Sequence, residues 1–176
     1  MSLDVAHTGV SPRVSVPILG MTLDLSTSLE QLVQREISPL RAFPEEKTSI
    51  HAGAASWSSK EELGHLIDSA TNNHVRFVRA MIEPEFRGPT YAQDDWVRVH
   101  RYQEMAWLTM VDFWFQYNSF LVSLLRRVPE EKTKTLCYVG AGQGVSLTFL
   151  VEDYVLHMQH HIDHLLGREK VTQYPA

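Results

Sequence analysis

The last apolar segment of the chain, residues 147–166, has the spacing of an amphipathic helix, and it constrains the fold more than any other feature. Its apolar side chains recur every three or four residues and form one stripe: Leu147, Leu150, Val151, Tyr154, Met158, Ile162 and Leu165. Gly167 follows directly and is a natural helix stop. Because a stripe of this kind has to pack against other elements, the segment predicts a helix that lines the core.

Four histidines lie on this same helix, at His157, His160, His161 and His164. At about 100° per residue, all four fall within a strip about 100° wide on one side of the helix. Two imidazoles four residues apart emerge one above the other and can bind one metal ion. The spacing therefore favours a metal site, and the alternative is a solvated polar face that happens to be rich in histidine.

The helical wheel also ranks the four histidines by their distance from the apolar stripe. His157 and His161 border the stripe, whereas His164 and His160 lie progressively further out. A metal site between helices needs ligands that point inward, so His157 and His161 are the better pair. Asp153, one turn before His157, is placed to orient a ligating ring as a hydrogen-bond acceptor.

Three further helical segments precede this one. A first helix is expected over about residues 26–42. A second begins at a capping box formed by Ser58 and Glu61 and continues to about Ile82. A third, rich in aromatic residues, covers about residues 94–127, where the likelier role of the aromatic stripe is packing.

Four helices without a convincing strand predict an all-α fold, a four-helix bundle with either up-and-down or crossover connections. We expect the bundle to occupy residues 23–170 as one domain, because a chain of 176 residues can bury a sufficient core. Residues 1–22 carry scattered glycines and prolines and are expected to form an irregular N-terminal arm. The polar loop of residues 129–146 contains several glycines but lacks the strand that precedes a nucleotide-binding loop.

The composition is that of an ordinary soluble globular protein, with 44% hydrophobic and 21% charged residues. A net charge of −5 gives no indication of a nucleic-acid partner or an anionic membrane partner. No segment resembles a signal peptide or a membrane span. The single cysteine, Cys137, suits the reducing cytoplasm and lies in a loop without an adjacent base, so we expect it to have no catalytic role.

A metal site on one helix needs a ligand from another element, and the second helix offers His65 and His74. Its apolar stripe has His74 almost at the centre and His65 on the opposite, polar side. Simple amphipathicity would therefore bury His74 and leave His65 exposed. A polar face can equally line a polar cleft, so spacing alone leaves the third ligand open.

Two segments resemble the signatures of a known family. Trp57-Ser-Ser-Lys-Glu-Glu-Leu-Gly-His65-Leu-Ile-Asp68 resembles the helix-two signature of the DinB/YfiT-like superfamily, and His157-x-x-His160-His161 resembles its helix-four signature. The aromatic-rich third helix is similar as well. The resemblance covers about residues 26–166, nearly everything except the arm.

The resemblance implies a DinB-like, crossover-connected four-helix bundle that holds a divalent metal with one histidine of helix two and two of helix four. On this chain those positions match His65, His157 and His161. The match agrees with the helical wheel on the last helix. On the second helix it favours His65, which the wheel places on the exposed side. His164 stands where many members have a glutamine. The roles of His160, His164 and His74 stay open.

Three neutral imidazoles on a divalent ion such as Zn²⁺ or Ni²⁺ leave open coordination positions, as in catalytic sites. An open site can lower the pKa of bound water for hydrolysis, or bind a thiol and deprotonate it. The resemblance implies both options, because relatives include S-transferases that use low-molecular-weight thiols and proteins described as metal-dependent hydrolases. We therefore expect a metal-dependent transferase or hydrolase that acts on a small molecule.

A second hypothesis is a metal-binding bundle without catalysis, which serves as a stress-related binding or interaction protein. A homodimer is one possible assembly. Whether an open coordination position faces a pocket of sufficient size would discriminate the two hypotheses. Weaker candidates for the wall of that pocket are Asp68, Asn72, Tyr91, Trp96 and Arg98.

Overall fold

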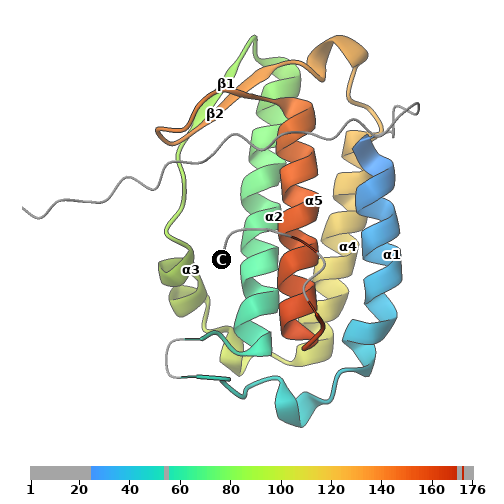
Figure 1. The fold of residues 1–176 in the computed structure, drawn as a ribbon, viewed down its shortest axis with the longest axis vertical. Coiled ribbons are helices and arrows are strands. Elements are labelled where there is room, and N and C mark those ends of the chain that lie inside the picture. The colour runs from blue at the N-terminus through green and yellow to red at the C-terminus, as the bar shows by residue number, and fades with distance from the viewer. Residues whose placement is uncertain (1–24, 54–55, 170–171, 173–176) are drawn as a thin grey trace, which may run out of the picture.

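Four long helices form the body of the molecule in the computed structural model, which describes residues 25–53, 56–169 and 172 (Figure 1). They are α1 (Leu25–Ala42), α2 (Ser59–Ile82), α4 (Trp107–Leu125) and α5 (Leu147–Leu165). Helix α1 packs against α4, α4 against α2, α2 against α5, and α5 against α1. The four contacts close a ring around one core, so the predicted four-helix bundle is confirmed.

The direction of the helices shows that the bundle is connected by a crossover. Helices α2 and α4 run the same way, while α1 and α5 run the opposite way (Figure 1). The chain therefore returns along the whole bundle between α2 and α4, and this return segment carries the short helix α3 (Gln93–His100). The predicted arm, residues 1–22, lies outside the described residues.

The apolar stripe of α5 lies in the core as predicted. Buried side chains of this stripe are Leu147, Leu150, Val151, Tyr154, Met158, Ile162 and Leu165. The largest side chains packed beside them include Trp107 and Trp114 of α4. Helix α2 begins at the predicted capping box, in which the Ser58 hydroxyl accepts from the Glu61 backbone and the Glu61 carboxylate accepts from the Ser58 backbone.

The predicted third helix of about residues 94–127 is wrong as a single element. It is divided into α3, the 3₁₀ turn η2 (Tyr102–Glu104) and α4. Arg101 adopts a left-handed conformation with φ 54° and ends α3, and Ala106 is extended before α4. The break lets the Tyr102 ring pack against α2, a tertiary contact that local helix propensity does not reveal.

The expectation of no strand is also corrected, on a small scale. Strands β1 (Phe86–Gly88), β2 (Leu136–Val139) and β3 (Val145–Ser146) form a sheet in the order β1-β2-β3. β1 pairs parallel with β2, and β2 pairs antiparallel with β3. Strands this short carry too few residues for a detectable alternation.

The sheet caps the end of the bundle where α2 ends and α5 begins (Figure 1). Its inner side buries Phe86 and Cys137. Burial raises the pKa of the Cys137 thiol to about 11, so this cysteine packs as an inert side chain at neutral pH. Across the described residues, no helix is long and apolar enough to cross a membrane.

Candidate metal centre

Three histidines from two helices meet between α2 and α5. His65 lies on the second turn of α2, and His157 and His161 lie one turn apart on α5. Each offers a ring nitrogen, and the three ligand atoms lie within 4.8 Å of one another. The ring centroids are 5.0 Å apart for His65 and His157, 4.7 Å for His65 and His161, and 4.4 Å for His157 and His161. The structure thus brings together the three residues that were predicted as metal ligands.

The nitrogen atoms converge as ligands would. The Nε2 atoms of His65 and His157 face each other at 3.0 Å. Two nitrogens bound tetrahedrally to one Zn²⁺ at about 2.05 Å would lie about 3.3 Å apart. A bound ion would therefore require only a small rearrangement of these two rings.

The helical wheel was wrong about the two histidines of α2. His65 is buried, with 1% of its surface exposed, because its polar side of α2 faces α5. His74 is only half-buried, and its Nδ1 is hydrogen-bonded to the Tyr117 hydroxyl of α4 at 2.9 Å. The structure places His74 away from the cluster, between α2 and α4.

The helical wheel also predicted the wrong order of exposure for His160 and His164. His160 is buried, with 5% exposed, whereas the His164 side chain is 45% exposed. Helix α5 packs against both α1 and α2, so it has two covered sides and not one apolar stripe. On the α1 side, Gln159 accepts a hydrogen bond from Arg35, which marks the contact that a single-stripe wheel misses.

Glu62 is the residue of the site that the sequence reasoning missed. It lies one turn before His65 on α2, and its Oε1 accepts a hydrogen bond from Nδ1 of His161 at 2.5 Å. Nδ1 of His164 lies 3.2 Å from the same oxygen. With Nδ1 committed to the carboxylate, Nε2 of His161 is left as the ligand atom. Glu62 lies on the polar face of α2, three residues from His65, and this position was the signal that could have identified it.

The electrostatics of the site favour an ionised Glu62. Burial opposes ionisation of this carboxyl, but the hydrogen bonds and charges of His161 and His164 together hold its pKa below the ordinary value. A carboxylate hydrogen-bonded to a histidine fixes the ring and makes its other nitrogen a better ligand. Glu62 is thus placed to orient the His161 ring.

Two of the three imidazoles are held neutral. Burial, with the nearby imidazole of His161, lowers the pKa of His65 to about 3. Burial and the imidazoles of His161, His65 and His160 lower the pKa of His157 to about 2. A histidine must be neutral to bind a metal, so at neutral pH these rings are already in the ligand form.

Aromatic side chains surround the cluster on its outer side. The Trp57 ring lies 4.8 Å from the His65 ring and 6.4 Å from the His161 ring. The Tyr91 hydroxyl lies 3.5 Å from Nδ1 of His65, and burial raises the pKa of Tyr91 to about 12. These rings cover His65, while His157 and His161 keep part of their surface exposed.

The weaker pocket candidates divide into two groups. Asp68 and Trp96 lie near the site: Asp68 is buried one turn after His65, and the Trp96 ring contacts Tyr91 at 5.2 Å. Asn72 donates to the backbone oxygen of Asp68 and so serves α2 itself. Arg98 pairs with Asp95 at the exposed surface of α3 and is not brought to the cluster.

Asp153 is the remaining candidate. It lies half-buried on α5, one turn before His157. Its role of orienting a ligating ring stays a prediction.

A shallow cavity of about 360 Å³ adjoins the centre. It lies between the start of α2 and the segment of α3 and η2, and Trp57 and Tyr102 form part of its wall. Trp57 also contacts two of the three histidines, so this side chain separates the cavity from the cluster. Arg98 lines this cavity and not the metal cluster itself.

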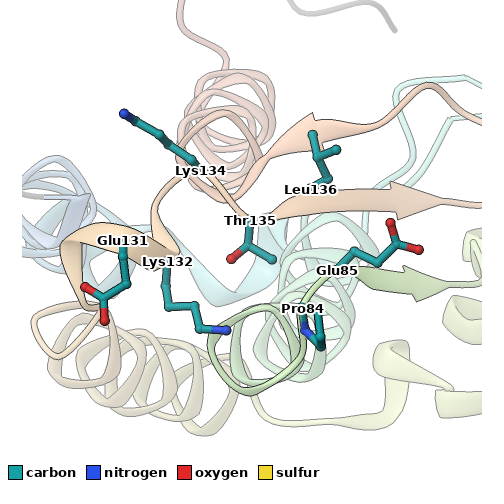
Figure 2. A pocket seen from close by; sticks show the side chains of 7 residues that line it. All are labelled: Pro84, Glu85, Glu131, Lys132, Lys134, Thr135 and Leu136. Carbon is teal, nitrogen blue, oxygen red and sulfur yellow. The ribbon is translucent and has the colours of Figure 1, made fainter.

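A second cavity, of about 440 Å³, lies beside Pro84 and Thr135, past the other end of α2 (Figure 2). Figure 2 shows Lys132 directed toward Pro84 and Lys134 pointing away. The Lys132 ammonium donates a hydrogen bond to the Glu83 backbone oxygen, so this ammonium group already has a partner. Ile82 lies 17 positions after His65 on α2, a rise of about 25 Å along the helix, so this cavity is far from the histidines.

The residues of the centre fit a divalent metal ion. Three imidazole nitrogens converge within 4.8 Å, two of the rings are neutral, and an ionised carboxylate orients the third. Nitrogen donors of this kind suit Zn²⁺ and Ni²⁺ better than Mg²⁺ or Ca²⁺, which prefer oxygen. In the described part of the chain, no fourth His, Cys, Asp or Glu joins the group.

Comparison with protein-family models and with curated proteins gives no match. Among solved structures, the chain is similar to YfiT from Bacillus subtilis, with 18% sequence identity, a TM-score of 0.77 and 90% of each chain covered. This chain has the YfiT fold. The fold that the sequence resemblance implied is thereby confirmed.

YfiT is described as a probable metal-dependent hydrolase with an unusual four-helix bundle topology. Because of the crossover between α2 and α4, successive long helices of the present bundle do not simply alternate in direction. At 18% identity, the similarity to YfiT establishes the common fold. The chemistry of this chain has to be argued from its own three histidines.

Proposed function

We propose that the protein is a divalent-metal-dependent enzyme that transfers a group of a small molecule to water or to a low-molecular-weight thiol. The observation that carries the proposal is the convergence of His65, His157 and His161 next to the carboxylate of Glu62. Zn²⁺ and Ni²⁺ are the ions that this donor set fits best. The description of YfiT as a probable metal-dependent hydrolase supports the same reading.

The number of protein ligands favours catalysis over a structural role. Structural zinc is usually closed by four protein ligands, whereas the described residues supply three. A divalent ion held by three imidazoles supplies a Lewis acid with open positions, at which the pKa of water or a thiol falls.

The surrounding residues hold the centre in place and limit access to it. His65 is fixed by burial, and Glu62 orients His161. Trp57 and Tyr91 cover the His65 side of the cluster and exclude water there. His157 and His161 retain exposed surface, which leaves one side for a substrate.

The cavity of about 360 Å³ beside Trp57 has none of the three histidines in its lining. We therefore expect a small substrate to approach on the exposed side of His157 and His161. We place the enzyme in the cytoplasm, since the one cysteine, Cys137, is buried and suits a reducing compartment.

The test loads the purified full-length protein with Zn²⁺ or Ni²⁺ and measures the metal bound per chain, the melting temperature with and without chelator, and activity. We expect about one ion per chain and a higher melting temperature in the loaded protein, because the ion binds only the folded bundle. Activity is screened on ester, amide and alkyl halide substrates, each with water alone and with added cysteine-containing thiols. His65→Ala is the inactive control and His74→Ala the matched one.

Each outcome of this test has a defined meaning. Turnover in water alone supports a hydrolase, and turnover that requires a thiol supports an S-transferase. Metal binding without turnover on any substrate would overturn the enzymatic proposal in favour of a non-catalytic metal-binding protein. Absence of metal binding would overturn both.

A further inference from the structure

Four strongly exposed apolar side chains lie on the two neighbouring helices α2 and α4. Val75 and Ile82 belong to α2, Phe113 and Phe120 to α4, and their exposed fractions run from 50% for Phe113 to 72% for Ile82. Each pair is seven residues apart, about two helical turns, so its members lie on one side of their helix. A half-exposed phenylalanine leaves about 100 Å² of its surface in water. Exposed apolar area of this extent marks an interaction site.

The ring of His74 joins the two helices into one surface. It contacts the Phe120 ring at 5.3 Å and the Tyr117 ring at 5.8 Å. The Tyr117 ring in turn lies 5.7 Å from the Phe113 ring and 6.3 Å from the Phe120 ring. On α2, positions 74, 78 and 82 follow at four-residue intervals and form one ridge. The surface, called here the α2–α4 face, consists of His74, Val75, Val78, Ile82, Phe113, Tyr117 and Phe120.

The α2–α4 face carries no Asp, Glu, Lys or Arg. Helix α4 has none of these residues in the whole segment 113–125, and none stands at positions 74, 75, 78 and 82 of α2. Asp112, next to Phe113, is paired with Arg41 of α1 at 2.8 Å. Arg79, next to Val78, is paired with Glu83 at 2.7 Å. An uncharged apolar centre with charged residues only at its edge is the composition of a protein–protein interface.

Helix α5 exposes a similar apolar pair in different surroundings. Phe149 and Leu156 are exposed and also lie seven residues apart. Two carboxylates, Glu152 and Asp153, stand between them in the sequence, and Glu152 is exposed. In a symmetric contact between two copies of a chain, the same patch faces itself, so these carboxylates would meet like charges. The charge pattern therefore favours self-association through the α2–α4 face and opposes it at α5.

We propose that the α2–α4 face is the interface of a homodimer in which the two α4 helices pack antiparallel across a two-fold axis. Helices α2 and α4 run the same way (Figure 1), so their dipoles add within one copy, and an antiparallel copy opposes them. The axis lies between Phe113 and Phe120, so each Phe113 packs against the partner's Phe120. The proposal does not rest on the proposed function, because the metal centre lies between α2 and α5.

Sedimentation equilibrium of the full-length protein tests the dimer, with micromolar concentrations and circular dichroism as a check of folding. We expect twice the mass of one chain. Phe120→Asp and Val75→Asp each place a carboxylate on both sides of the axis, so each should weaken the dimer at least about 30-fold. Two variants on two helices keep the test valid if one of them fails to fold. Phe149→Asp, the same change at an exposed phenylalanine of α5, is the matched control and should leave the dimer unchanged.

Disulfide cross-linking tests the antiparallel arrangement. The native Cys137 is buried, so cysteines introduced at the surface react without it. An equal mixture of Phe113→Cys and Phe120→Cys proteins should form a disulfide-linked dimer under mild oxidation, faster than either protein alone. A mixture of Phe113→Cys and Phe149→Cys proteins is the control and should stay unlinked.

Several results would overturn the proposal. They are a monomeric wild type at all concentrations, a dimer that both Phe120→Asp and Val75→Asp leave intact, and an equal loss in Phe149→Asp. A monomeric wild type that binds phosphatidylcholine vesicles, and loses this binding in Phe120→Asp, would assign the face to a lipid surface instead. Cross-linking that is fastest between identical variants would overturn the antiparallel arrangement.

Discussion

Helix α2 carries two histidines, His65 and His74, whose surroundings differ. His65 lies on the polar face of the helix, yet it is buried against α5 beside two other imidazoles and a carboxylate. His74 lies on the apolar stripe, yet it is half-buried and bonded to a tyrosine hydroxyl of α4. Its ring contacts those of Tyr117 and Phe120 at 5.8 and 5.3 Å.

The difference shows that the neighbouring helix, and not the polarity of a residue's own helix face, decides what a histidine does. The polar face at His65 meets the polar edge of α5, so both faces are hidden from water together. His74 meets aromatic side chains that offer one hydrogen bond and no second ligand. We therefore expect His65 to serve the metal centre and His74 to serve packing.

The largest effect should come from removing His65. His65→Ala leaves two ring nitrogens in place of three, so we expect the affinity for Zn²⁺ or Ni²⁺ to fall at least about 1,000-fold, about 4 kcal/mol. His157→Ala and His161→Ala should behave alike. Competition with a chromophoric chelator measures the affinity.

His74→Ala is the matched control for that measurement, because it removes the same side chain from the same helix. Its metal affinity should stay within about threefold of wild type. Equal losses in His65→Ala and His74→Ala would show that the contrast between the two environments has no consequence for metal binding.

The next effect concerns the stability of the metal-free protein in acid. Folded His65 and His157 have pKa values of about 3 and about 2, below the ordinary value of about 6.5. The unfolded chain therefore binds protons below about pH 6.5 that the folded protein does not, and the free energy of unfolding falls as pH falls toward 3. Two histidines give a slope of up to about 2.7 kcal/mol per pH unit, with none above about pH 7.

Urea denaturation of metal-free protein between pH 7.5 and 4.5 measures this slope. His65→Asn should reduce it by about half, because the side chain of asparagine does not titrate. A free energy of unfolding that is flat from pH 6.5 to 5, or an unchanged slope in His65→Asn, would contradict the picture of buried neutral imidazoles.

A smaller effect should follow from changing the carboxylate that distinguishes the His65 environment. Glu62→Gln removes the charge that orients His161, so metal affinity should fall about 10- to 100-fold while the three ligands remain. Glu152→Gln, on the exposed side of α5, is the control and should have wild-type affinity. A Glu62→Gln variant with wild-type metal affinity would show that the carboxylate does not orient His161 for metal binding.

Much of the fold could be predicted from the sequence because it depends on local signals. The stripe of α5 recurs at helical spacing, and the capping box of Ser58 and Glu61 lies within four residues. The break at Arg101 could not be predicted, since its cause is the contact of Tyr102 with Gly64, about forty residues earlier in the chain.

The site divides in the same way. The pair His157 and His161 follows from its spacing on one helix. Periodicity alone left the choice between His65 and His74 open, and the family resemblance pointed to His65. Glu62 was missed because its partner, His161, is 99 residues away and no local pattern joins them.

The smallest effect should come from the His74 environment. Tyr117→Phe keeps the aromatic ring but removes the hydroxyl that is hydrogen-bonded to His74 at 2.9 Å. A partly buried hydrogen bond of this kind contributes about 0.5–1.5 kcal/mol, so the free energy of unfolding in urea should fall by that amount. A double-mutant cycle with His74→Gln should assign the loss to the pair, and metal affinity should not change. A Tyr117→Phe variant with wild-type stability but weakened metal binding would reverse the comparison, because His74 would then contribute to the metal centre and not to packing.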